Sequence, residues 1–218
     1  MTDMNNKHDS MIAREGYPFI FPLVFFTLSA AFLTHRWVTF VLFLFTCFVV
    51  WFFRNPERKF PVGEKLIISP ADGKVIQIEE IKDHELFPGT SKKISIFMNI
   101  FSVHVNRFSC GGRIETIRYY PGKFLSANLD KASSDNERNA ILIKTEDGRL
   151  ILTIQIAGLV ARRIVCWVRE GMNVSKGERF GLIRFGSRVE VLLPSDSAIL
   201  VKVGDKVRAG ETPIGDLS

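Results

Sequence analysis

Three side chains of this sequence have the chemistry to activate a peptide bond: Asp72, His104 and Ser187. A carboxylate that orients a histidine, which then takes a proton from a hydroxyl, forms a charge-relay set. Ser187 follows Gly186 at the head of "RFGSRVEVLLP", whose alternating apolar residues are typical of a β-strand. Each residue also has a structural interpretation. The Gly-Ser pair suits a tight turn, His104 a hydrogen-bonded core position and Asp72 the turn of "SPADG".

Two uncharged apolar runs, residues 17–34 and 37–53, lie in the first quarter of the chain and are separated by His35-Arg36. Each run is near the lower limit of the roughly 17–25 residues that a membrane-spanning helix needs. We predict an N-terminal arm over residues 1–16 and a helical membrane hairpin over residues 17–53. The hairpin either crosses the membrane twice or enters one leaflet. A buried hairpin in a soluble core is disfavoured, because neither run has a polar face.

Basic residues flank the outer ends of this hairpin, whereas its connecting turn holds a single arginine, Arg36. Lys7 and Arg14 precede it, and a basic stretch that includes Arg54 and Arg58 follows it. Loops rich in Lys and Arg stay in the cytoplasm. We therefore expect location at the cell membrane, with both ends of the hairpin and the domain that follows on the cytoplasmic side.

The charge and the cysteines limit the function classes. The formal net charge is +6, and the region from residue 54 onward carries all of it, with 26 Lys and Arg against 20 Asp and Glu. A mildly basic domain suits an anionic lipid surface or a nucleic acid, or reflects solubility alone. Of the two partners we expect the lipid surface and no nucleic acid. The three cysteines, Cys47, Cys110 and Cys166, are too few and too scattered for a disulfide framework or a zinc site. We therefore expect a reducing, cytoplasm-facing location and no metal.

Residues 54–218 consist of short apolar runs broken by Gly, Pro and Asp. This pattern predicts ten or more short strands and a mainly β, barrel-sandwich-like domain, with residues 122–139 as a long loop. Residues 168–178, "VREGMNVSKGE", match residues 201–211, "VKVGDKVRAGE", at Val, Gly, Val, Gly and Glu. The match predicts two related β-units with glycines at the hairpin corners, and Gly186-Ser187 lies between them.

The same repeat pattern is typical of biotinyl and lipoyl carrier domains. The alternative function is therefore a membrane-tethered carrier or scaffold domain without self-cleavage. A carrier needs an exposed lysine in the hairpin between its two halves. This chain has Phe-Gly-Ser-Arg there, residues 185–188, which disfavours the alternative.

Five motifs in order resemble the phosphatidylserine decarboxylase family in its short form: "FFRNPER", "SPADGKV", "SVHVNR", "AGLVARRIVCWV" and "FGSRVEVLLP". The resemblance runs from about Gly16 to Gly215. No single motif is specific, but five in order behind a membrane hairpin are highly specific. The resemblance implies a self-processing decarboxylase that converts phosphatidylserine to phosphatidylethanolamine in phospholipid biosynthesis.

The resemblance also implies the covalent cofactor, a pyruvoyl group formed from Ser187 when the chain cleaves itself between Gly186 and Ser187. His104 is then the base for Ser187, and Asp72 holds the imidazole in the required tautomer. The products are a large chain of residues 1–186 and a small chain of residues 187–218, which stay associated. The pyruvoyl ketone forms a Schiff base with the amine of the serine headgroup and accepts the electrons released with CO2.

Two departures from long-form relatives limit what this resemblance implies. Phe101 stands where those relatives have a second histidine, so a proton-donor role for that histidine is not transferred. The cleavage motif is Phe-Gly-Ser-Arg, whereas long-form relatives have Leu-Gly-Ser-Thr. Arg188, like the pair Arg162-Arg163, suits either a lipid phosphate or a structural ion pair. A pyruvoyl decarboxylase for a soluble amino acid is a further alternative, against which the hairpin argues. The sequence does not decide whether the substrate is an ester-linked or an ether-linked serine lipid, nor whether the protein forms a homo-oligomer.

Overall fold

The computed structural model describes residues 10–33, 36–123, 135–158, 163–184 and 186–217. The chain forms two compact units, residues 1–57 and residues 58–218. The first unit contains the apolar runs and the second contains every strand from β1 to β14. The arginine pair at 162–163 falls partly outside the described residues, since Arg162 is among those not described.

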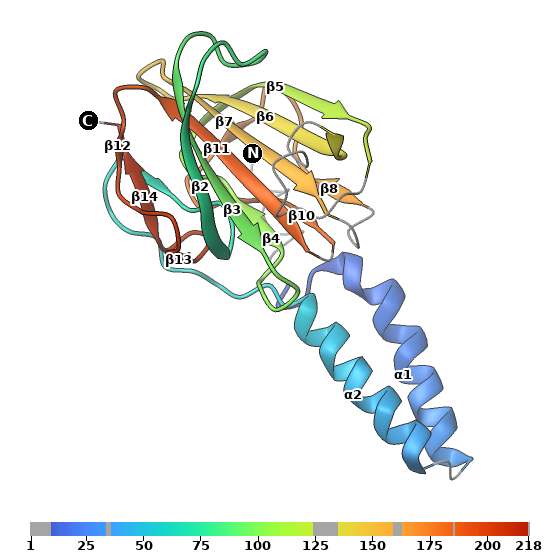
Figure 1. Cartoon of the computed structure of the whole chain (residues 1–218). Helices are drawn as coiled ribbons and strands as arrows, with labels where there is room; N and C mark the ends of the chain where they lie inside the picture. Colours follow the sequence, from blue (N-terminus) through green and yellow to red (C-terminus); the bar gives the residue numbers. More distant parts are fainter. Residues whose placement is uncertain (1–9, 34–35, 124–134, 159–162, 185, 218) are drawn as a thin grey trace. The chain divides into compact units, whose positions relative to one another are not determined.

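The first unit is a pair of helices, α1 (Tyr17–Phe32) and α2 (Arg36–Phe52), preceded by a 3-10 turn at Arg14–Gly16 (Figure 1). The Thr27 and Thr46 hydroxyls face one another across the pair at 3.1 Å. Large apolar side chains along both helices, such as Phe21 and Phe25, are exposed. The predicted helical hairpin is thus confirmed, and its outward apolar faces are unlike those of a soluble core.

Among the described residues, one helix, Arg14–Phe32, is long and apolar enough to cross a membrane. The second apolar helix, Arg36–Phe52, is shorter, with 17 residues.

The second unit is mainly β, as predicted. Its strands in chain order are β1 (Leu66–Ile68), β2 (Gly73–Ile81), β3 (Ser91–Met98), β4 (Val105–Arg107), β5 (Gly112–Tyr120), β6 (Arg138–Lys144), β7 (Leu150–Ala157), β8 (Ile164–Cys166), β9 (Asn173–Val174), β10 (Arg179–Ile183), β11 (Ser187–Pro194), β12 (Ala198–Ile199), β13 (Lys206–Val207) and β14 (Pro213–Asp216). They form an eight-stranded sheet in the order β13-β2-β3-β11-β7-β6-β5-β9, together with two three-stranded sheets. The large sheet is strongly curled, and β11 runs through its middle (Figure 1).

Two related β-units are visible in the strand pairing. The small sheet β1-β14-β12 has the same arrangement as the small sheet β4-β10-β8. The short strand β13 adds to β2 in one unit, just as β9 adds to β5 in the other. The repeated sequence segments contain β9 and β13, so the sequence repeat and the structural repeat coincide.

Equivalent hydrogen bonds close the corners of the two units. The Gly210 amide donates to the Ser69 carbonyl at 2.9 Å. Its counterpart, the Gly177 amide, donates to the Phe108 carbonyl at 2.8 Å. Both glycines have a left-handed backbone, with φ of +79° and +80°, which explains why the repeat keeps glycine there.

The strand alternation of β11 separates the two faces of the large sheet. Val189, Val191 and Leu193 join the main core together with the inward residues of β3 and β7. Leu192 belongs to a smaller cluster on the opposite face, which the Leu86-Phe87 segment contacts. The predicted strand after the Gly-Ser pair is therefore confirmed, and it is buried on both faces.

Arg188 lies in a buried polar network on that opposite face. Its guanidinium is fully buried and approaches the Glu190 carboxylate at 3.0 Å. It also donates to Gln77 Oε1 at 2.7 Å and to Ser95 Oγ at 2.9 Å. Of the two interpretations given by the sequence, the structural ion pair is the one that this arrangement supports.

We expect Arg188→Ala to destabilise the domain by about 3–5 kcal/mol, because it removes the guanidinium 3.0 Å from the buried Glu190 carboxylate, and the Lys93 ammonium lies farther from that carboxylate, at 3.8 Å. Denaturant unfolding in detergent of a precursor that carries Ser187→Ala, and so stays in one piece, measures this change. Replacing both partners, Arg188→Met with Glu190→Met, removes the buried charges together and should recover most of the loss. A double variant as unstable as Arg188→Ala would contradict the ion-pair explanation.

Candidate active site

The Gly186-Ser187 bond lies at the start of β11, the central strand of the large sheet. Gly186 has φ of +66°, a left-handed conformation that a side chain would strain. Ser187 is fully buried and pairs with Met98 of β3 on one side and Ala157 of β7 on the other. Its hydroxyl donates to the Met98 sulfur at 3.4 Å, a weak acceptor. The peptide bond thus joins an open turn to a strand that is fixed on both sides.

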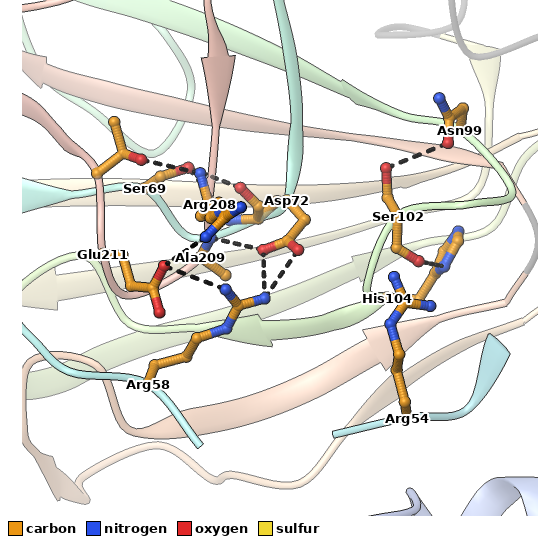
Figure 2. Close-up of polar contacts among 12 residues, drawn as sticks. Arg54, Arg58, Ser69, Asp72, Asn99, Ser102, His104, Arg208, Ala209 and Glu211 are labelled. Carbon is orange, nitrogen blue, oxygen red and sulfur yellow. Dashed lines mark hydrogen bonds and ion pairs between the residues drawn. The ribbon is translucent and has the colours of Figure 1, made fainter. Parts of the chain in front are cut away.

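His104 brings a base to this bond. The ring is 2% exposed, and its Nε2 accepts the Gly186 N–H at 3.4 Å. Its Nδ1 is 2.9 Å from the Ser102 carbonyl (Figure 2). Because Nε2 accepts from an amide and a carbonyl can only accept, the proton sits on Nδ1. The Nε2 lone pair therefore points at the residue before Ser187.

A tight turn after β3 holds the Ser102 carbonyl in place. The Ser102 amide donates to the Asn99 carbonyl at 3.0 Å, and the Phe101 amide donates to the Asn99 side chain at 2.8 Å. Phe101, which occupies the place of the second histidine of long-form relatives, is 60% exposed. The side chain at this position therefore points to solvent in the precursor.

Asp72 does not contact His104 in the structure. Its carboxylate accepts both an Arg58 N–H at 2.8 Å and the Ala209 amide at 2.8 Å. Arg58 also approaches Glu211 at 3.2 Å, so these residues form one ion-pair cluster. Figure 2 draws this cluster apart from the Ser102–His104 pair, with no interaction joining them.

The structure does not show the contacts of the expected charge-relay set. The sequence assigned the fixing of the imidazole tautomer to Asp72, but the Ser102 carbonyl faces Nδ1 instead. The physical reason is that Arg58, a cation 14 residues before Asp72, engages both carboxylate oxygens. Neither does the structure join the Ser187 hydroxyl to His104, because that hydroxyl turns toward Met98.

The cysteines of the β domain do not offer a competing nucleophile. Burial raises the pKa of the Cys110 thiol to about 12. Burial also raises the pKa of the Cys166 thiol. Both therefore stay protonated near neutral pH, when thiolate is the reactive form. Within the described residues, His, Cys, Asp and Glu side chains form no group of three that could hold a metal ion.

Further buried polar residues near Ser187 were not predicted. Asn106 and Gln155 are fully buried, and Asn139 is nearly so. Asn106 lies two residues after His104, so strand alternation offered a signal for it. Gln155 lies within the run "LILTIQIAG", and its only signal was its polar side chain in a strand that is otherwise apolar apart from Thr153.

Comparisons with known proteins show the family. A family model described as Phosphatidylserine decarboxylase matches residues 45–215. The chain belongs to the phosphatidylserine decarboxylase family. The matched segment holds Asp72, His104 and the Gly186-Ser187 pair, and it begins within α2.

Members of the phosphatidylserine decarboxylase family are also similar along nearly the whole chain. The phosphatidylserine decarboxylase proenzyme of Syntrophus aciditrophicus is 61% identical over 210 residues, covering 96% of this chain and 99% of the relative. The proenzyme of Desulfotalea psychrophila is 48% identical over 206 residues, covering 94% and 96%. That of Magnetococcus marinus is 46% identical over 214 residues, covering 97% of each.

Proposed function

We propose that this chain decarboxylates phosphatidylserine to phosphatidylethanolamine, using a pyruvoyl group that it makes from Ser187. The observation that carries the proposal is the meeting of a left-handed glycine, a buried serine and a histidine base at one peptide bond. Family membership supports the reaction, and the word proenzyme in the relatives' names supports a cleaved precursor.

Self-cleavage begins when the Ser187 Oγ turns from Met98 and attacks the Gly186 carbonyl carbon. His104 Nε2 takes the hydroxyl proton and delivers it to the departing Ser187 nitrogen. A C–O bond forms and the Gly186–Ser187 C–N bond breaks, so the amide becomes an ester. Gly186 favours the attack, because no Cβ crowds its carbonyl and its left-handed turn is open.

The ester then breaks by β-elimination. A base removes the Ser187 Cα proton, the Cβ–O bond breaks, and the electron pair leaves on the Gly186 carboxylate. Residues 1–186 are then a separate chain that is no longer covalently joined to residues 187–218. Water adds to the resulting dehydroalanine, through its imine form, and ammonia leaves, so position 187 ends as a ketone.

The residues around position 187 fit such a group. The site is fully buried, and β3 and β7 hold the backbone from both sides. A pyruvoyl group supplies an electron sink, a carbonyl that takes up the electron pair released when an amine substrate loses CO2. The chain itself contributes a water-poor position and the His104 imidazole as a group that can hold or return a proton. Asp72 acts as a positioning residue, because its carboxylate binds Arg58 and the Ala209 amide and so fixes the corner before β2.

The small chain stays in the domain after cleavage. Its strand β11 pairs with β3 and β7, β14 pairs with β1, and β13 pairs with β2. Every one of these partner strands belongs to residues 1–186. Cutting one bond at the start of β11 therefore leaves the sheets intact.

We propose attachment to the cell membrane through the hairpin, with the β domain on the cytoplasmic side. The apolar helix Arg14–Phe32 and the exposed apolar side chains of α1 and α2 support the attachment. The basic residues outside the hairpin support the orientation. Such an anchor raises the effective concentration of a diacyl substrate at the site.

Apolar attachment should resist salt and alkaline carbonate washes and yield only to detergent. Charge attraction, in contrast, is screened within about 10 Å at 0.1 M salt. Deleting residues 1–57 should release the β domain from membranes while leaving self-cleavage intact, since residues 58–218 form a compact unit of their own. Sedimentation of washed membranes, with immunoblotting, measures both. A deleted chain that still sediments fully with washed membranes would assign the attachment to the β domain.

The substrate assignment is tested with purified, matured protein and carboxyl-labelled substrates. We expect release of labelled CO2 from phosphatidylserine in mixed micelles and none from free serine or aspartate. Release from a free amino acid but not from the lipid would contradict the proposed substrate.

A further inference from the structure

A chain of buried amides leads from the sheet to Ser187. Asn139 Nδ2 donates to Gln155 Oε1 at 3.1 Å, and Gln155 Nε2 donates to Asn106 Oδ1 at 2.9 Å. Asn139 and Gln155 face each other across β6 and β7, while Asn106 comes from β4 in a small sheet. The three side chains are between 0% and 3% exposed, so protein groups must satisfy them.

The direction of these bonds fixes the orientation of the last amide. Because Gln155 donates to the Asn106 oxygen, the Asn106 NH2 group must point the other way. Each donor in the chain is polarised by the one before it, which strengthens the final N–H as a donor. The chain therefore delivers an N–H of defined direction at its Asn106 end.

That N–H reaches only a weak acceptor. Among the described residues, the acceptor for Asn106 Nδ2 is the Met98 sulfur, at 3.7 Å. The Ser187 hydroxyl donates to the same sulfur at 3.4 Å. A buried amide and a buried hydroxyl thus share one thioether sulfur as their acceptor. Leaving such groups poorly satisfied lowers the stability of the fold by about 1–3 kcal/mol each. Natural proteins keep such costs mainly where the group has a function.

We propose that Asn106 is a catalytic hydrogen-bond donor for self-cleavage, stabilising negative charge on the Ser187 Oγ. This inference rests on the proposed function. Charge develops on that oxygen when His104 removes its proton for the attack on Gly186. Charge develops there again when the Cβ–O bond breaks and the oxygen leaves as part of the Gly186 carboxylate. Gln155 and Asn139 act as positioning residues, because they aim the Asn106 amide.

The test uses the full chain, synthesised in vitro so that cleavage can be followed from the uncut precursor. Asn106→Leu keeps the branched shape of the side chain but removes the donor, and we expect cleavage to slow by about 10²–10³-fold. Thr153→Val is the matched control. Thr153 is also fully buried on β7, and its hydroxyl has no hydrogen-bond partner among the described residues, so cleavage should keep its rate.

A second variant leaves Asn106 in place. Gln155→Glu presents an acceptor to Asn106, which should turn its NH2 group toward position 155 and its carbonyl toward Ser187. Cleavage should slow as it does in Asn106→Leu.

Two further readouts separate this donor role from a structural one. The thermal midpoint of the Asn106→Leu precursor should stay within a few degrees of the Ser187→Ala precursor. Turnover per pyruvoyl group, after slow maturation is complete, should stay within about threefold, since the Ser187 oxygen has then left.

Cleavage of Asn106→Leu at the normal rate would overturn the proposal. Slow cleavage accompanied by an equal loss of turnover per pyruvoyl group and a large fall in thermal midpoint would overturn it too, in favour of a packing role. Neither result touches the proposed function, which is tested separately by self-cleavage of the unaltered chain and by its release of CO2 from phosphatidylserine.

Discussion

Ser187→Ala should leave the chain in one piece and without decarboxylase activity. Alanine at position 187 has no hydroxyl to attack the Gly186 carbonyl, so neither the ester nor the pyruvoyl group forms. The fold should survive, because Ser187 is buried with its hydroxyl bound only to the Met98 sulfur among the described residues. Denaturing electrophoresis and release of labelled CO2 measure the two losses.

Ser109→Ala is a suitable control for this experiment. The Ser109 hydroxyl is also buried, and it has no hydrogen-bond partner among the described residues. Its loss should leave cleavage and turnover unchanged. Normal cleavage of Ser187→Ala would show that another residue starts the reaction and would end the assignment of Ser187.

His104→Ala should slow self-cleavage by about 10²–10⁴-fold, the usual contribution of a general base. The Nε2 lone pair that accepts the Gly186 N–H is lost, and no proton acceptor replaces it. His84→Ala is the matched control, because His84 binds the Leu86 amide within its own loop and should not affect cleavage. A time course of precursor disappearance measures both. If His104→Ala matured at the normal rate, His104 would be a core residue and not the base.

Comparison of His104→Ala with Asp72→Asn shows whether the Asp72 carboxylate acts on the His104 imidazole during cleavage. Asp72 contacts Arg58 and the Ala209 amide, so its variant should slow cleavage less than His104→Ala does. An equal loss would mean that the carboxylate reaches the imidazole during the reaction.

The sequence predicted those features that depend on local pattern. Alternation at Val189, Val191 and Leu193 predicted β11 because adjacent residues of a strand face opposite sides. The repeated glycines predicted two related units because Gly177 and Gly210 need a left-handed backbone at the same place in each unit. The uncharged runs predicted two helices because each is close to the length that an apolar membrane-spanning helix needs.

The contacts between distant residues could not be predicted in this way. The order Asp72, His104, Ser187 is compatible with a charge-relay set, but the order of residues along the chain does not show which cationic side chain pairs with the Asp72 carboxylate in the fold. Arg58 does so here. For Arg188, next to the Gly186-Ser187 bond, the sequence left open a phosphate ligand or a structural ion pair. Strand alternation turns it to the face opposite Ser187, where Glu190 and Ser95 bind it.

The position proposed for cleavage explains how a precursor can mature without unfolding. The proposed cleavage falls at the first residue of the central strand, where an open turn meets paired backbone. The turn can change its conformation during the acyl shift, while β3 and β7 keep β11 in register. The new chain end is thereby fixed in the place where it is made.

Intact-mass analysis of the purified, active protein tests the central claim most directly. We predict two species, one of residues 1–186 and one of residues 187–218, the second with 32 residues and a blocked amino terminus whose mass corresponds to a pyruvoyl group. A single species of 24.7 kDa from active material would contradict the claim, because a chain that is active and uncut cannot have made its cofactor from Ser187.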